Sequence, residues 1–270
     1  MTTTTFTPSA ELRQRSRVGW AVADALTITQ RNLIGYTRIP QALFFSTLQP
    51  IMFVLLFRYA FGGAIPINGT AYVNYLLPGI FAQAVVFGSV NTAIGLADDA
   101  SKGLIERFRS LPMAPSAVLA GRTLADLCRN VFVVLLMTGV GYLVGFRVQT
   151  NLFAYLAGFL LVLAFAYALS WGAAFMSMGA ENGETASLML FPIVFPFTFA
   201  SSAFVPTGSM PGWLQAFANN QPVTKVVNAV RALMLGGPTA KPVLHAGLWI
   251  VAMLVVLAPA AVRRYRNRTA

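Results

Sequence analysis

Six apolar runs, each long enough to cross the hydrocarbon core of a membrane, constrain this chain more than any other feature. Hydrophobic residues make up 57% of its 270 residues and charged residues only 10%, against about 25% charged residues in an ordinary globular domain. The sequence therefore predicts an all-α polytopic membrane protein with six transmembrane helices and no room for a separate soluble catalytic domain. The runs lie at Ala42–Phe61, Tyr75–Ala97, Asn130–Phe146, Leu152–Met176, Ala186–Val205 and His245–Val262.

Lysine and arginine are concentrated on one side of these predicted spans. The segments before the first run, between the second and third runs, and after the sixth run carry fourteen of the 19 basic residues. Because cytoplasmic segments of membrane proteins are enriched in Lys and Arg, both termini are predicted to lie in the cytoplasm. The net charge of +11 then reflects topology and attraction to anionic inner-leaflet lipid, so no nucleic-acid partner is expected.

The residues missing from the spans exclude several classes of membrane protein. An ion-coupled carrier usually holds an ionisable group near the bilayer midplane, and no Asp, Glu, Lys or His is expected deep in any run. His245 is the only histidine and Cys128 the only cysteine, so neither a catalytic residue nor a metal or cofactor site is expected. No P-loop motif occurs. If ATP drives this protein, another polypeptide must hydrolyse it, and the chain itself is not an enzyme.

One internal segment, residues 98–129, holds nine of the 27 charged side chains. Leu104, Ile105, Phe108 and Leu111 have the spacing of one apolar helix face, and Pro112 should end that helix. Ser116 is a suitable N-cap for a second helix, in which a charged stripe recurs at i, i+4 and i+7. The segment predicts a helix-break-helix cytoplasmic projection, with its stripe formed by Arg122, Asp126 and Arg129.

Two stretches of the sequence carry a family resemblance. "SKGLIERFRSLPMAPSAVLAGRTLADLCRNVFVVLLMTGVGYLVGF" resembles the cytoplasmic-loop signature of the ABC type 2 permease superfamily, in its daunorubicin/doxorubicin-resistance permease branch. "FVPTGSMPGWLQAFANNQPVTKVVNAVRALMLGG" resembles the outer segment between the last two spans of that branch. The likeness extends from about Leu26 to Arg264 and therefore covers nearly the whole chain.

The resemblance implies a role for the segment after the second span. In such permeases this segment forms a coupling helix that docks into a cleft of a separate ATP-binding subunit. From spacing alone, a solvated charged face resting on lipid headgroups explains the same pattern equally well. By resemblance, the residues expected to couple this chain to the ATPase subunit are Gly103, Leu104, Glu106, Arg107, Phe108 and Arg109.

The remaining segments complete the predicted organisation. Residues 1–17 are expected to be a disordered cytoplasmic tail, and residues 18–39 an amphipathic interfacial helix, which the resemblance identifies as an elbow helix. Residues 40–262 are then the six-span domain, and residues 263–270 a basic cytoplasmic tail. Within that domain, residues 206–244 predict an extracellular helical hairpin that ends at Gly236 and Gly237, and an inert surface loop is the alternative.

Together these features predict the permease subunit of an ATP-binding-cassette exporter in the bacterial cytoplasmic membrane. Two copies of an ATPase subunit and a second permease copy, identical or homologous, are the expected partners. A path lined by Phe, Met and Leu favours an amphiphilic or lipid-like substrate, and the resemblance adds hydrophobic antibiotics. Export of polysaccharide or glycoconjugate is one alternative. A non-transporting membrane subunit that only binds a partner is another.

Overall fold

The computed structural model describes residues 17–38, 40–65, 67, 70–104 and 115–267. Helices joined by loops and turns make up these residues, with no strand among them, which confirms the all-α prediction. The helices are α1 (Arg17–Arg38), α2 (Pro40–Leu56) with its π-helical extension η2 (Phe57–Phe61), α3 (Tyr72–Ser101), α5 (Pro115–Leu143), α6 (Leu152–Ser177), α7 (Gly183–Phe199), the 3-10 turn η3 (Thr207–Ser209), α8 (Gly212–Asn220), α9 (Pro222–Leu235) and α10 (Ala240–Asn267).

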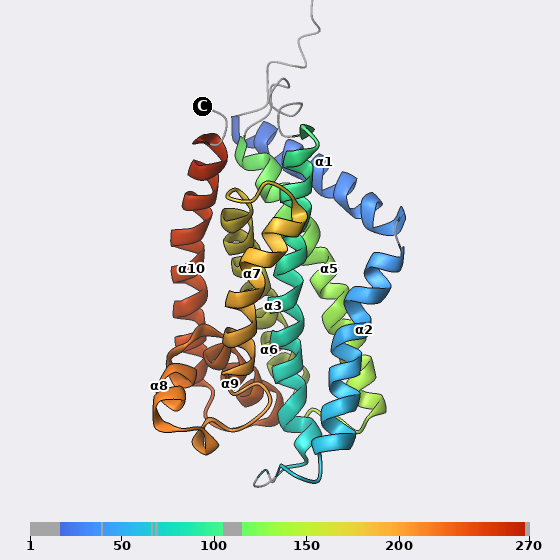
Figure 1. The fold of residues 1–270 in the computed structure, drawn as a ribbon. Coiled ribbons are helices and arrows are strands. Elements are labelled where there is room, and N and C mark those ends of the chain that lie inside the picture. Colours follow the sequence, from blue (N-terminus) through green and yellow to red (C-terminus); the bar gives the residue numbers. More distant parts are fainter. Residues whose placement is uncertain (1–16, 39, 66, 68–69, 105–114, 268–270) are drawn as a thin grey trace, which may run out of the picture.

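Six of these helices run alternately up and down and form an antiparallel bundle (Figure 1). They are α2, α3, α5, α6, α7 and α10. Helix α1 lies across the end of the bundle at which α10 finishes, here called the α1 end. Helices α8 and α9 lie at the opposite end, the α8 end. The six apolar runs thus form one bundle in which successive helices reverse direction.

Four of the bundle helices are long and apolar enough to cross a membrane. They are α3, α5, α6 and α10, with 26 to 30 residues each. The other two apolar stretches, Thr47–Phe61 and Gly183–Phe199, are shorter than 18 residues. Length and composition therefore establish a multi-span membrane protein with at least four candidate spans.

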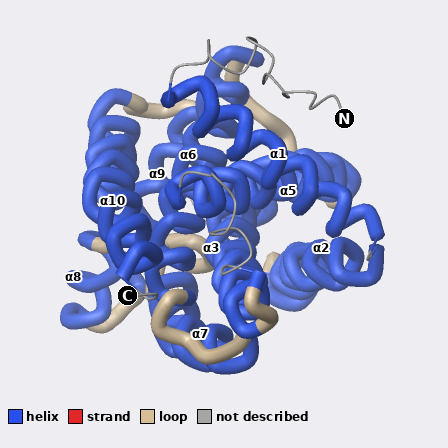
Figure 2. Tube along the Cα trace, turned by 90° about the horizontal axis from the view of Figure 1, so that it is seen from above, coloured by secondary structure: helices blue, strands red, loops and turns tan. Residues whose placement is uncertain are grey.

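Helix α3 is the centre of the bundle. In its most apolar window 67% of the residues are buried, against 11% in α10. It packs against α2, α5, α6, α7 and α9, and it lies inside the bundle in the view from above (Figure 2). Its polar residues make internal contacts, such as the Asn74 side chain that accepts a hydrogen bond from the Arg147 N–H at 3.0 Å. The second apolar run, Tyr75–Ala97, contains several polar residues, and it nevertheless forms the innermost helix.

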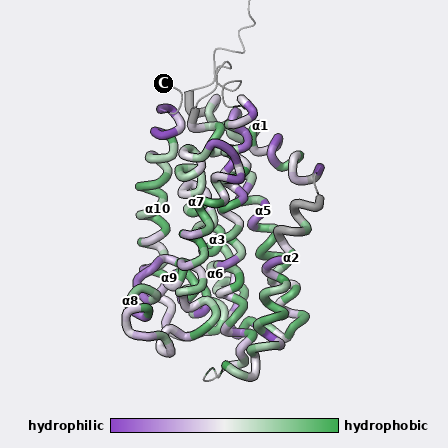
Figure 3. The backbone as a smooth tube through the Cα atoms, in the orientation of Figure 1, coloured by the Kyte–Doolittle hydropathy of each residue, from purple (hydrophilic) through white to green (hydrophobic). Residues whose placement is uncertain are grey.

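The outward faces of the bundle are apolar. Hydrophobic residues dominate its middle, and hydrophilic ones gather at the α1 end and around α8 (Figure 3). Buried apolar residues also fill the interior. The helices are therefore apolar both toward the core of the bundle and toward its surroundings, as helices of a bundle in lipid must be. Exposed large apolar side chains include Leu156 and Leu160 of α6, Leu188 and Phe195 of α7, and Leu248, Val251 and Val255 of α10.

Local sequence signals explain several helix ends. The Asn151 and Asn182 side chains cap α6 and α7 by accepting backbone N–H bonds at 2.8 and 2.9 Å. Pro222 occupies the first turn of α9, where a missing N–H has no cost. Gly236 follows the last residue of α9 with a φ of 93°, a conformation that favours glycine. The helix stop predicted at Gly236 is therefore confirmed.

Several predicted boundaries differ from the structure. Both ends of the predicted loop 98–129 belong to bundle helices, since α3 continues to Ser101 and α5 begins at Pro115. Ser116 is thus the second residue of α5, and the predicted second loop helix is continuous with the third apolar run. Helix α10 similarly takes in the end of the predicted hairpin 206–244 and most of the predicted tail 263–270.

Candidate functional site

The predicted coupling residues lie at the α1 end, after the last turn of α3. Gly103 has a φ of 68°, and its N–H donates to the Ala100 carbonyl at 3.1 Å. Leu104 follows and is half-buried. The other predicted residues, Glu106, Arg107, Phe108 and Arg109, lie outside the described residues.

A buried cluster of charged side chains joins α1 to α5 at the same end. The Tyr36 hydroxyl of α1 donates to Asp126 Oδ1 of α5 at 2.5 Å. Arg122 Nε lies 3.6 Å from Asp126 Oδ2, and Arg129 Nη1 lies 4.0 Å from Asp126 Oδ1. The Asp126 side chain is fully buried, and those of Arg122 and Arg129 are only 13% and 4% exposed. We call Tyr36, Arg122, Asp126 and Arg129 the α1–α5 cluster.

The cluster corrects one expectation from the sequence. Its charged stripe was expected on a cytoplasmic projection, whereas the structure buries it inside the bundle helix α5. Burial and the neighbouring carboxylate of Asp126 raise the pKa of Tyr36 to about 12, so its hydroxyl stays protonated and available as a donor.

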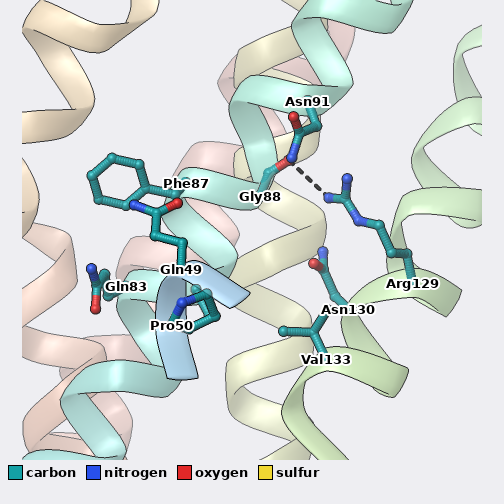
Figure 4. Close-up of a pocket in the computed structure, with 10 residues that line it drawn as sticks. Gln49, Pro50, Gln83, Phe87, Gly88, Asn91, Arg129, Asn130 and Val133 are labelled. Carbon is teal, nitrogen blue, oxygen red and sulfur yellow. Dashed lines mark hydrogen bonds between the residues drawn. The ribbon is translucent and has the colours of Figure 1, made fainter. Parts of the chain in front are cut away.

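Two glycines of α3 make room for the two arginines. A Cβ atom on Gly95 would lie 2.0 Å from Arg122 Nη2, and one on Gly88 would lie 3.1 Å from Arg129 Nη2. The Arg129 guanidinium also donates to the Gly88 carbonyl at 2.8 Å, as Figure 4 shows. The two glycines are seven residues apart on α3, and the two arginines are seven residues apart on the antiparallel helix α5, so each arginine lies against its own glycine. This matched spacing is present in the sequence, but it indicates a contact only once α3 and α5 are known to pack side by side.

Two cavities adjoin the cluster. The smaller one, about 40 Å³, lies between α2, α3 and α5 and is lined by amide side chains that include Gln49, Gln83 and Asn130 (Figure 4). The larger one, about 760 Å³, opens between α1, α3 and α5 and is called the α1 cavity. Its lining residues come from those three helices and are Arg31, Asn32, Ile34, Gly35, Tyr36, Arg38, Asn91, Ile94, Gly95, Asp98, Asp99, Arg122 and Arg129.

A second polar network, at the α8 end, is built around Arg231 of α9. Its guanidinium donates to the backbone carbonyls of Tyr75, Ser202 and Ala203 at 2.9, 2.5 and 3.0 Å. The same group lies 3.5 Å from the centre of the Tyr75 ring. Burial lowers the pKa of Arg231 to about 10, which leaves it charged at neutral pH. Arg231 therefore ties α9 to α3 and to the segment after α7.

The Arg231 network also explains the sequence pattern of the predicted hairpin. Val223, Val227, Val230 and Met234 form an apolar face of α9, and all four are buried. On another face, Thr224 is buried and accepts from the Ser202 N–H, while the exposed Asn228 accepts from the Ser202 hydroxyl. Apolar and polar side chains of α9 therefore both contact the rest of the bundle.

Comparisons with known proteins agree with this architecture. Residues 24–235 match the ABC-2 type transporter family. The chain is 33% identical to the daunorubicin resistance ABC transporter permease protein DrrB1 of Streptomyces coeruleorubidus, over 93% of this chain and 88% of that protein. It is 32% identical to the doxorubicin resistance ABC transporter permease protein DrrB of Mycobacterium tuberculosis, over 77% of each chain. The resemblance noted in the sequence is confirmed, and the chain belongs to the ABC-2 type transporter family of membrane permeases.

Proposed function

We propose that this chain is one half of the translocation unit of an ATP-driven exporter in the bacterial cytoplasmic membrane. The observation that carries the proposal is the match to ABC transporter permeases along nearly the whole chain. The bundle supports it, because six apolar helices that alternate in direction suit a six-span permease. Six helices enclose little space alone, so a second permease copy completes the path.

The proposed orientation places the α1 end in the cytoplasm. That end carries the basic residues of α1, the start of α5 and the end of α10, and cytoplasmic segments of membrane proteins are enriched in such residues. Trp20, Val22 and Leu26 of α1 are exposed apolar residues on a helix across the bundle end, which suits a position in the inner leaflet. Both chain termini are then cytoplasmic.

Coupling to the ATPase subunit is proposed for Gly103, Leu104, Glu106, Arg107, Phe108 and Arg109. The segment follows α3, the most buried helix, so a force applied there would act directly on the centre of the bundle. Gly103 and Leu104 at the end of α3 lie at the proposed cytoplasmic end. Two ATP-binding subunits, each docked on one permease copy, would close on nucleotide binding and open the path outward.

The proposed cargo is an amphiphilic drug or a lipid-like molecule. The permeases that this chain resembles are named for daunorubicin and doxorubicin resistance. Aromatic side chains of η2, α7 and the segment after α7 stack on one another in the core of the bundle. The ring centres of Phe57 and Phe204 are 4.7 Å apart, and those of Phe199 and Phe204 are 5.2 Å apart. Glycan export remains the alternative for the cargo, since aromatic surfaces also bind sugar rings.

A transport assay tests the proposed function. The permease is co-expressed with the proposed ATP-binding subunit, and inside-out vesicles are given daunorubicin and ATP. The proposal predicts ATP-dependent drug accumulation that disappears when the P-loop lysine of the partner is replaced. Accumulation of a lipid-linked glycan instead would reassign the cargo, and movement of neither class would favour the non-transporting subunit.

A co-purification experiment tests the coupling segment separately. Glu106→Arg and Phe108→Ala are compared with wild type for recovery of the ATP-binding subunit from detergent-solubilised membranes. Lys241→Glu, an exposed site at the α8 end, is the matched control. Loss of the partner only from the first two variants is expected. Full recovery with all three would move the docking site elsewhere, for example to α1.

A further inference from the structure

The α1–α5 cluster holds more positive than negative charge in a buried place. Arg122 and Arg129 share the single carboxylate of Asp126, and all three side chains are at most 13% exposed. Asp126 Oδ1 also accepts a hydrogen bond from the Tyr36 hydroxyl. A buried charge is costly unless it is paired, so one of the two guanidiniums needs a further anion.

Arg122 is the guanidinium that is short of acceptors. Its Nε is buried and makes no hydrogen bond to the described residues, and its Nη2 donates to the Asn91 carbonyl only at 3.4 Å. Arg129, by contrast, has a 2.8 Å bond to the Gly88 carbonyl. Arg122 also lines the α1 cavity and lies against Gly95, which keeps its guanidinium at the cavity wall.

The other carboxylates around the cavity have partners of their own. Asp99 lies 3.7 Å from Arg31, and Asp98 Oδ1 accepts the Gly183 N–H of α7 at 2.8 Å. Among the described residues, and with Asp126 included, the cavity has three carboxylates and four arginines, the fourth arginine being Arg38. Within this part of the chain, the cavity therefore has an excess of one positive charge.

We propose that the α1 cavity binds the phosphate group of a membrane amphiphile, with Arg122 and Arg129 as its main ligands. Guanidinium groups bind phosphate oxygens through paired hydrogen bonds. The Nε–H group of Arg122 makes no hydrogen bond to the described residues and can donate to a phosphate oxygen. A volume of about 760 Å³ is that of a site for a drug-sized ligand and exceeds what a free phosphate ion fills.

The surroundings of the cavity favour a phosphate attached to acyl chains. Ile34 and Ile94 line the cavity beside the arginines, and Ile34 is 43% exposed. The cavity thus has apolar side chains next to arginines, as binding of an anionic lipid requires. This inference does not depend on export or on the identity of the cargo.

Thermal unfolding of the purified permease in a neutral detergent tests the proposal. Dihexanoyl phosphatidic acid, dihexanoylglycerol and inorganic phosphate are each titrated at equal ionic strength. Phosphatidic acid is expected to raise the unfolding temperature in a saturable way, whereas dihexanoylglycerol should not. An equal response to inorganic phosphate would overturn the lipid source and leave a free-phosphate site. No response to either phosphate compound would overturn the proposal.

Two variants locate the site. Arg122→Gln is expected to weaken the apparent affinity for phosphatidic acid roughly tenfold or more, the usual effect of losing a charge-assisted hydrogen bond. Gly95→Ala should also weaken it, because the added Cβ displaces the guanidinium without changing the charge. Arg263→Gln, at an exposed site on α10, removes the same charge and should bind as wild type.

A purely structural role for Arg122 predicts a different pattern. Without ligand, Arg122→Gln leaves Arg129 and Asp126 as a balanced pair, so its unfolding temperature should equal or exceed that of wild type. If Arg122 is only structural, the variant unfolds earlier and keeps its response to phosphatidic acid. Either a retained response or an equal loss in Arg263→Gln would overturn the assignment of the site.

Discussion

At the scale of single residues, Arg231 joins three segments of the chain that are far apart in sequence. Its Nε and Nη2 groups donate to backbone carbonyls of α3 and of the segment after α7. Arg231→Ala removes a charged donor from each of these partly buried carbonyls, of which that of Ser202 keeps the Tyr75 hydroxyl. The change should cost about 3 kcal/mol or more of unfolding free energy. Arg231→Lys keeps the charge but loses the planar fork and the stacking on Tyr75, so we expect an intermediate loss.

Thermal unfolding in detergent measures both Arg231 variants. Lys241→Ala is the control, because Lys241 is exposed at the same end of the bundle. We expect the unfolding temperatures to rank as wild type and Lys241→Ala, then Arg231→Lys, then Arg231→Ala. An unfolding temperature for Arg231→Ala equal to that of wild type would show that α9 is held by its buried apolar face alone.

Tyr36 makes the hydrogen bond that links α1 to the buried Asp126. Tyr36→Phe removes one donor from a buried carboxylate and should cost about 1 to 3 kcal/mol. Tyr59→Phe makes the same chemical change at a side chain that is 72% exposed, and it should be neutral. Equal unfolding temperatures for the two variants would mean that the arginines alone satisfy Asp126.

At the scale of elements, the docking of α1 depends on close contact with α5. A Cβ on Gly121 would lie 2.6 Å from the Ala25 carbonyl oxygen and 2.6 Å from Ile28 Cβ, both in α1. Gly121→Ala should therefore push α1 away and break the 3.1 Å bond from the Thr29 hydroxyl to the Gly121 carbonyl. Gly139→Ala is the control on the same helix, because nothing lies within 4 Å of its Cβ position.

Hydrogen exchange of the backbone amides measures this effect. In Gly121→Ala we expect faster exchange in Arg17–Arg38 with little change in α6 and α10, whereas Gly139→Ala should match wild type. Unchanged protection of α1 in Gly121→Ala would show that the two helices adjust without separating.

The sequence predicted some elements better than others, for physical reasons. Apolar runs located the bundle helices, since length and hydropathy alone identify a span. The charged stripe on α5 was placed on the outside, because a spacing of i, i+4 and i+7 is the same on a solvated face and on a buried one. Only the matching glycines of α3, at positions 88 and 95, distinguish the two cases. The pairing of Arg231 with Tyr75 involves residues 156 positions apart, which no local pattern reveals.

At the scale of the whole molecule, the proposed orientation makes a labelling prediction. Cys128 is the only cysteine, so Cys128→Ser provides a cysteine-free background. Gly208→Cys at the α8 end should react with a membrane-impermeant maleimide in intact spheroplasts. Asn267→Cys at the end of α10 should react only after permeabilisation. The reverse pattern would invert the orientation, and labelling of both sites in intact spheroplasts would mean an even number of crossings between them.

The central claim is that the chain forms a transport path whose energy comes from a separate ATPase. The most direct measurement is ATP turnover by the purified complex in proteoliposomes, with and without daunorubicin. We predict no turnover by the permease alone, basal turnover by the complex, and several-fold stimulation by the drug. Turnover by an intact complex that no drug, lipid or glycan changes would contradict the claim and identify a membrane subunit that binds its partner without moving cargo.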